Sequence, residues 1–190
     1  MEGNYLTNQL LVAMPTLGDP NFSHTVTLIC EHTREGALGI VINRPLEMTL
    51  GEVFEQLELA THDLELGERP VLRGGLVRPE RGFVLHSPVD GEDATYDTTL
   101  TLSPALQVTT SRDILVSIAK GEGPRDAVVA LGYAGWGAGQ LEDEIRSNAW
   151  LNVPADPQII FRLPFEARWQ GAMRLLGIDS GRLSSLSGRA

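Results

Sequence analysis

Residues 132–142 read Gly132-Tyr-Ala-Gly135-Trp-Gly137-Ala-Gly139-Gln-Leu-Glu142, with four glycines set among aromatic and small residues. Glycine loses more backbone freedom on folding than any other residue, so this density indicates a shaped backbone rather than a filler loop. A glycine loop that leads into a helix N-terminus can also bind an anion. Here, however, the expected helix starts with acidic residues, which suit its dipole but repel phosphate. The stretch therefore predicts a defined backbone conformation but indicates no particular reaction.

The composition of the whole chain limits what the protein can be. Its 190 residues, 42% hydrophobic and 21% charged, are typical of a globular protein with a sizeable core. The net charge of -10 argues against direct binding to nucleic acid or to a membrane. The sequence has no apolar run of membrane-helix length and only one cysteine, Cys30, and we expect no signal peptide because the N-terminal residues lack a basic region. We therefore expect a cytoplasmic protein without a disulfide, as a monomer or weak oligomer.

Apolar periodicity predicts alternating strands and helices without an internal repeat. The predicted strands cover residues 8–14, 24–32, 37–43, 70–73, 82–86, 95–102, 126–133 and 158–163. Helices are expected after the caps Thr49 and Ser111, and over residues 140–147 and 166–176. Residues 58–69 are expected to form an acidic, mobile connection. No linker divides the chain, so we predict one domain over residues 1–183 and a disordered tail over residues 184–190.

Several motifs along the chain carry a resemblance to a known family. They are Leu11-Val-Ala-Met-Pro15, Gly36-Ala-Leu-Gly-Ile-Val-Ile-Asn-Arg-Pro45, Gly74-Gly75, Arg81-Gly-Phe-Val-Leu-His86, Ser111-Arg-Asp-Ile-Leu115, residues 132–142 and Asn148-Ala-Trp150. In this order, and over nearly the whole chain, the sequence resembles the AlgH/YqgE family of small bacterial proteins. The family pattern has a proline after the paired glycines, where this chain has Leu76. The resemblance therefore leaves the conformation of that turn open.

The resemblance implies a fold but assigns no biochemical activity. The expected fold is α/β (α+β), a single domain whose mixed, split β-sheet folds into a pseudo-barrel with flanking helices. The family name reflects a link to the regulation of exopolysaccharide (alginate) and virulence-factor production. Since the charge of this chain argues against contact with DNA, we expect any such role to be indirect, through a protein partner or a small ligand.

Cysteine and histidine residues offer one possible site. Cys30 and His32 are expected to share one face of a strand, and His86 ends another strand. Together they could form a metal site or a cysteine–histidine pair. The spacing lacks a second ligand pair, and cysteine is among the most often buried residues, so we favour a structural role. We predict neither a metal nor a cofactor. His86 by itself suits a general base, a ligand contact or a hydrogen-bonded structural residue.

Arginines beside turns offer a second site. In Asn43-Arg44-Pro45, the guanidinium of Arg44 could bind a carboxylate or phosphate, or it could pair with an acid of the chain itself. The pairing with an acid is favoured because acids outnumber bases. The run Arg73-Gly74-Gly75, followed by Arg78 and Arg81, could surround an anion with guanidinium and backbone N–H groups, or its arginines could simply be solvated.

Aromatic and glycine residues of the 132–142 stretch offer a third site. Tyr133, Gly135, Trp136 and Gly137 could line a cleft, or Trp136 could anchor the core while the glycines permit close packing. The candidate ligand-binding residues are therefore His32, Asn43, Arg44, Gly74, Gly75, His86, Gly135, Trp136 and Gly137.

Three functions agree with these observations. The first is a small-ligand-binding or regulatory protein that takes an anionic ligand. The second is a hydrolase or transferase with His32 or His86 as its base, although the chain carries no nucleophile elbow, zinc motif or dinucleotide fingerprint. The third is an adaptor whose acidic residues 52–69 bind a basic protein partner. The sequence favours them in this order, and it favours binding over catalysis.

Overall fold

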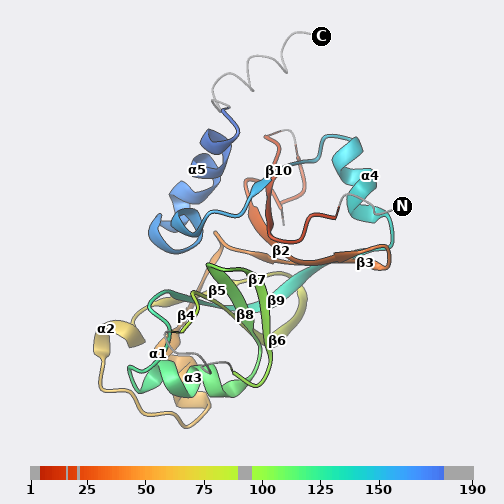
Figure 1. Ribbon diagram of the computed structural model, residues 1–190. Coiled ribbons are helices and arrows are strands. Elements are labelled where there is room, and N and C mark those ends of the chain that lie inside the picture. The colour runs from red at the N-terminus through yellow and green to blue at the C-terminus, as the bar shows by residue number, and fades with distance from the viewer. Residues whose placement is uncertain (1–4, 16, 21, 90–95, 178–190) are drawn as a thin grey trace.

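Strand β9 (Ala127–Gly137) joins the two halves of the fold, because its partners change along its length (Figure 1). Its first half pairs antiparallel with β6 (Val77–His86) and parallel with β5 (Pro70–Arg73). Its second half pairs antiparallel with β3 (Gly36–Val41). The sheet thereby changes neighbours in mid-strand and curls into a half-barrel. The prediction of a mixed, split sheet with flanking helices is confirmed.

The computed structural model describes residues 5–15, 17–20, 22–89 and 96–177. Within this part the sheet has ten strands, and no helix is long and apolar enough to cross a membrane. The predicted tail over residues 184–190 lies outside the described residues, as does the predicted domain boundary at residue 183.

The glycine run belongs to β9, so the prediction that the strand ends at residue 133 and a loop follows is wrong. Along residues 134–137, Ala134 and Trp136 are buried while Gly135 and Gly137 are exposed. This period of two is the signature of a strand with one buried face. Because the exposed positions are glycines rather than polar residues, the sequence lacks the apolar–polar alternation that usually indicates such a strand. Gly139, with φ of 75°, then begins the predicted helix α4 (Gln140–Arg146).

The first half of the sheet has the order β10-β1-β2-β3-β9. Its further strands are β1 (Gln9–Ala13), β2 (Val26–Thr33) and β10 (Trp150–Pro154), and α4 and α5 (Arg168–Leu175) lie at its two sides (Figure 1). The strands predicted over residues 24–32 and 37–43 are confirmed as β2 and β3, and they pair antiparallel as a hairpin. Strand β10 was not among the predicted elements.

A β-bulge between Ile29 and Glu31 interrupts the alternation of β2. The extra residue separates Cys30 from His32, so the prediction that they share one face is wrong. Cys30 packs in the large central core cluster, and burial raises the pKa of its thiol to about 12. His32 instead contacts Glu142 of α4. Cys30 is thus a buried, protonated packing residue, as favoured from the sequence.

The second half of the fold holds the remaining strands and further helices (Figure 1). The elements are β4 (Pro45–Thr49), β7 (Thr99–Ser103), β8 (Leu106–Thr109), α1 (Leu50–Gln56), α2 (Leu64–Gly67) and α3 (Arg112–Ala119). The capping box of Thr49 and Glu52 at the start of α1 is confirmed. The connection expected to be mobile contains α2, because the Asp63 side chain accepts a hydrogen bond from the Leu66 N–H and caps this turn.

The last part of the described residues is helical, where the sequence predicts a strand over residues 158–163. The structure has a π-helix, η1 (Gln158–Arg162), and a 3-10 turn, η2 (Phe165–Ala167), before α5. The neighbours Ile159 and Ile160 are both buried, which a strand with one buried face does not allow. A short apolar run does not distinguish a strand from a buried helical turn by periodicity, and this explains the wrong prediction.

Candidate functional site

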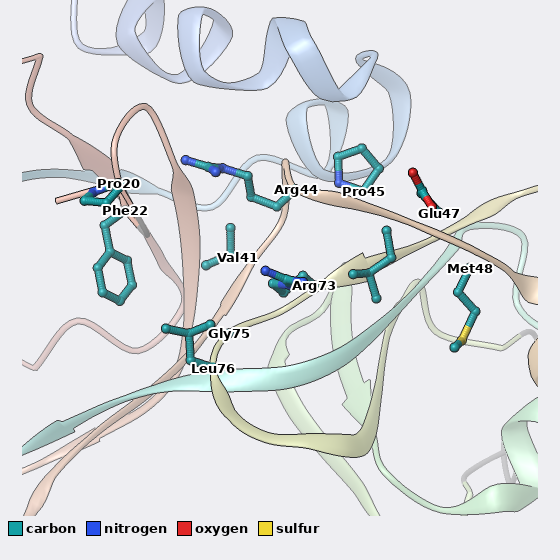
Figure 2. A pocket seen from close by; sticks show the side chains of 11 residues that line it. Pro20, Phe22, Val41, Arg44, Pro45, Glu47, Met48, Arg73, Gly75 and Leu76 are labelled. Atoms are coloured by element: carbon teal, nitrogen blue, oxygen red, sulfur yellow. The ribbon is translucent and has the colours of Figure 1, made fainter.

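A cleft of about 640 Å³ opens beside the turn that joins β3 to β4 and the end of β5 (Figure 2). Its walls are mainly apolar and its charged groups are two arginines and one glutamate. The lining residues are Pro20, Phe22, Val41, Arg44, Pro45, Leu46, Glu47, Met48, Arg73, Gly75 and Leu76. An apolar pocket with a few polar groups is the usual form of a small-molecule site.

Arg44 lies in the turn just before β4, and Arg73 is the last residue of β5, which pairs with β4. The Arg73 N–H donates to the Arg44 carbonyl oxygen at 2.8 Å, and this contact joins their backbones. The Arg44 side chain donates through Nη2 to the Ser23 carbonyl oxygen at 2.5 Å. In Figure 2 it reaches toward Pro20, above Arg73 and Gly75.

Neither arginine takes part in an ion pair among the described residues. The acidic partner expected for Arg44 is therefore missing from that part of the chain, and a backbone carbonyl takes its place. A neutral oxygen leaves the charge of the guanidinium uncompensated, so the other donors of Arg44 can still bind an anion.

Asn43 positions this turn. Its Oδ1 accepts from the Val26 N–H at 2.9 Å, and its Nδ2 donates to the His24 carbonyl oxygen at 2.8 Å. Both ends of the amide are thus used to hold the turn against the start of β2. Asn43 does not line the cleft, and it supports Arg44 through the backbone rather than by touching a ligand.

The paired glycines lie where the chain crosses β9. A Cβ on Gly75 would stand 2.0 Å from the Tyr133 carbonyl carbon, and one on Gly74 would stand 2.4 Å from the Gly132 carbonyl oxygen. Real Cβ atoms do not approach backbone so closely. Gly132 itself has φ of +78°, which L side chains rarely adopt. The glycines are thus required by a close approach of two backbones.

The backbone of Gly74 is already satisfied, which weakens the prediction that it binds an anion. Its N–H donates to the Leu131 carbonyl oxygen and its own carbonyl accepts from the Val41 N–H, both at 2.8 Å. Gly75 does line the cleft. The next residue, Leu76, is 56% exposed and adds an apolar side chain to the cleft at the position where the family pattern has proline.

His86 lies away from the cleft and is completely buried. Its Nδ1 contacts the Ser87 carbonyl oxygen at 2.8 Å, and its Nε2 contacts the Thr109 hydroxyl at 2.7 Å. Because a carbonyl oxygen only accepts, Nδ1 carries the proton and Nε2 accepts from the hydroxyl. Burial lowers the pKa of His86 below its ordinary value of 6.5. Both nitrogens of this neutral ring are occupied, so it has no lone pair left to act as a base.

We expect His86 to make the protein less stable in mild acid. Since the pKa of His86 is lowered in the folded state, the unfolded chain binds this proton first as the pH falls. The stabilisation from the neutral ring is complete above about pH 6.5 and decreases below it. Between about pH 7.5 and pH 5.5, the free energy of unfolding, measured with urea, should therefore fall less in His86→Gln than in wild type. His62→Gln, at an exposed position, is the control, and an unchanged pH dependence in His86→Gln would contradict the assignment.

His32 is buried between the N-terminal segment and α4. Its Nδ1 accepts from the Leu6 N–H at 3.0 Å, and its Nε2 therefore donates to the Glu142 carboxylate. The Tyr5 ring stands edge-on to it, with the ring centroids 5.2 Å apart. His32 thus ties the start of the chain to α4, and it does not line the cleft.

Trp136 anchors the core beneath α4. It is 5% exposed, and its Nε1 donates to Glu144 Oε1 at 3.4 Å, an oxygen that Trp150 also contacts at 3.1 Å. Gly135 and Gly137 lie on the exposed side of β9, and none of these residues lines the cleft. Of the two roles considered from the sequence, the geometry favours the core anchor.

The cleft thus brings together Arg44 and Gly75 from the candidate ligand-binding residues and Arg73, which the sequence offered as a possible anion contact. Its apolar lining, such as Phe22, Met48 and Leu76, carried no signal in the sequence because isolated apolar residues of this kind usually belong to the core. Within the described residues, no three His, Cys, Asp or Glu side chains are grouped to hold a metal ion.

Comparison with known proteins agrees with this fold. The AlgH-like family model matches residues 10–181. A UPF0301 protein from Thioalkalivibrio sulfidiphilus is 54% identical, and the match covers 97% of this chain and 96% of the relative. A UPF0301 protein from Stenotrophomonas maltophilia is 53% identical, and the match covers 96% of this chain and 95% of the relative. The solution structure of the AlgH protein from Pseudomonas aeruginosa has a TM-score of 0.79 and 45% identity, covering 100% of this chain and 97% of that chain. A crystal structure from Corynebacterium diphtheriae, at 22% identity and a TM-score of 0.76 over 97% of this chain and 94% of that one, shares the fold.

The motifs, the half-barrel sheet and these relatives agree over nearly the whole length of the chain. The protein therefore belongs to the AlgH-like family.

Proposed function

We propose that the protein is a cytoplasmic ligand-binding or regulatory protein that takes a small anionic ligand in the cleft between Arg44 and Arg73. One observation carries the proposal. Two guanidinium groups, without an acidic partner among the described residues, line one cleft of a chain whose net charge is -10. Although Glu47 also lines the cleft, neither guanidinium is paired with it, so both keep donors that an anionic ligand can take.

The lining of the cleft supports a particular class of ligand. The planar fork of Arg44, held in place by the Ser23 carbonyl, suits a carboxylate or phosphate group. Phe22, Met48 and Leu76 offer apolar surface to the rest of the molecule. The ligand we propose is therefore a carboxylate or phosphate with an apolar or aromatic body. Binding of such a ligand could act indirectly on alginate or virulence-factor production, through a protein partner that distinguishes the ligand-bound protein from the free protein.

A thermal-shift screen tests this function. The panel holds carboxylates, sugar phosphates, nucleotides and flavins, and a ligand at a hundred times its dissociation constant should raise the melting temperature by about 5 to 10 °C. We expect Arg73→Gln to abolish the shift because this exposed side chain contributes charge to the cleft and has no ion pair among the described residues. Arg34→Gln, an exposed arginine in the β2–β3 turn, is the matched control and should keep the shift.

Two outcomes would contradict the proposal. One is a ligand that shifts wild type and Arg73→Gln equally. The other is a blank across the panel at about millimolar ligand, the range of weak binding. A blank would favour a protein partner on the acidic segment 52–69, where Leu64 is 83% exposed beside exposed acids.

A further inference from the structure

A second cleft, of about 310 Å³, lies between the start of β9 and the helical segments near the C-terminus. It shares no lining residue with the cleft of Arg44 and Arg73. Four arginines and a single acidic residue line it, and these are Arg69, Arg125, Arg162, Arg168 and Asp126. This is a concentration of positive charge in a strongly acidic chain.

Arg168 is the most unusual group in this second cleft, because it is only 3% exposed. Its guanidinium donates to the backbone carbonyls of Leu163, at 3.1 Å, and of Ile42, and it lies over the Phe165 ring at 4.5 Å. It forms no ion pair with any described residue. Burial without a carboxylate lowers the pKa of Arg168 to about 10. Buried charges in proteins are normally paired, so this cation lacks the counter-charge that such positions have.

The rim of the second cleft does not supply that counter-charge. Asp126 is paired with Arg162, with 3.0 Å between carboxylate oxygen and Nη2. Arg69 and Arg125 are exposed and have no ion pair within the described residues. Three arginine charges in this cleft are therefore without a carboxylate in that part of the chain. An anion from outside would find several guanidinium donors in one place.

The second cleft is also lined by apolar side chains. Ile118 comes from α3, Val129 from β9, and Phe161 and Phe165 from the segments η1 and η2. A fully hydrated ion such as inorganic phosphate leaves these surfaces uncovered. A ligand with an aromatic or aliphatic body would cover them while its anionic group reaches the arginines.

We propose that this second cleft is a distinct binding site for a small phosphate or carboxylate attached to an aromatic or aliphatic body. Arg69, Arg125 and Arg168 bind the anionic group, and the apolar side chains of the lining contact the body. The site is independent of the proposed function, since its residues are separate from those around Arg44.

Phenyl phosphate and benzoate, titrated separately into the full chain with methyl and amide NMR detection, test this site. We expect saturable shifts at Ile118 and Val129, with inorganic phosphate and phenol each binding at least about tenfold more weakly. The stronger of the two aromatic probes identifies the anionic group that the site prefers. The double variant Arg69→Gln/Arg125→Gln should weaken that probe at least about tenfold and leave the fold intact, since both side chains are exposed. Arg73→Gln and Arg34→Gln are the controls and should bind the probe as wild type does.

The results also separate this site from the first one. Shifts at the second cleft that persist in Arg73→Gln support the inference, whatever the thermal-shift screen finds for the first cleft. The inference is overturned if Ile118 and Val129 do not respond to either aromatic probe up to about 10 mM, or if the double variant binds like wild type. The inference is also overturned if the probe-induced shifts are lost in Arg73→Gln but kept in the double variant, a result that would still support the proposed function.

Discussion

Gly75→Ala is expected to lower the free energy of unfolding by more than about 3 kcal/mol, which is beyond the usual cost of an added methylene. A Cβ at this position would lie 2.0 and 2.1 Å from the Tyr133 carbonyl carbon and oxygen and 2.3 Å from the Ala134 nitrogen. All three are backbone atoms of β9, so no side-chain rotation relieves the overlap. Because β9 pairs with β3, β5 and β6, a shift of its backbone disturbs both halves of the sheet.

Gly135→Ala is the matched control, since Gly135 lies two residues beyond Tyr133 in the same strand. The nearest atom to a Cβ there is 3.6 Å away, an ordinary contact, and this glycine does not have a positive φ. We expect a change within about 1 kcal/mol, with stabilisation possible because alanine restricts the unfolded chain. Urea denaturation followed by circular dichroism compares the two variants with wild type. Equal unfolding midpoints for Gly75→Ala and Gly135→Ala would refute the crossing as the reason for the paired glycines.

Arg168→Ala is expected to lower the free energy of unfolding by about 3 to 5 kcal/mol, as the sum of several losses. The guanidinium donates to the carbonyls of Ile42 and Leu163, and each buried acceptor left without a partner costs about 1 to 3 kcal/mol. The contact with the Phe165 ring and the packing of the apolar stem are lost as well. The contact with Ile42 joins α5 to the residue that follows β3, so its loss should loosen the helix from the sheet.

Arg174→Ala removes a positive charge from the same helix at an exposed position and should change stability by no more than about 0.5 kcal/mol. Arg168→Lys retains the charge but lacks the planar fork, so we expect an intermediate loss. Urea unfolding at neutral pH gives the free energy of unfolding of all three variants for comparison with wild type. If Arg168→Ala unfolds at the same urea concentration as Arg174→Ala, the buried guanidinium does not stabilise the fold in the way described.

Features that depend on neighbouring residues were predictable from the sequence. The strands predicted over residues 24–32 and 37–43 and the helix cap at Thr49 are confirmed. The predicted strand over residues 70–73 is also confirmed as β5. In each case the signal and the structure it produces lie within a few residues, where the side chains themselves select the backbone conformation.

The composition of the candidate cleft was only partly predictable. Arg44 and Arg73 stood out because each is next to turn residues, yet nothing in the sequence indicated that the two would meet. They meet because β4 pairs with β5 and the Arg73 N–H binds the Arg44 carbonyl. His32 and His86 were candidate site residues because an imidazole can act as a base, but each is buried at a different place and hydrogen-bonded through both ring nitrogens.

Short-range chemistry was therefore sufficient to predict most of the strands, most helix starts and the residue types able to bind an anion, while the mixed, split sheet was expected from the family resemblance. Long-range contacts were needed to make residues 134–137 a strand, to separate Cys30 from His32 by a bulge, and to place two arginines in one cleft. The physical reason is that caps, periodicity and turn glycines act along the chain. Strand register, close backbone crossings and cleft walls depend instead on segments that meet only when the sheet has closed around β9.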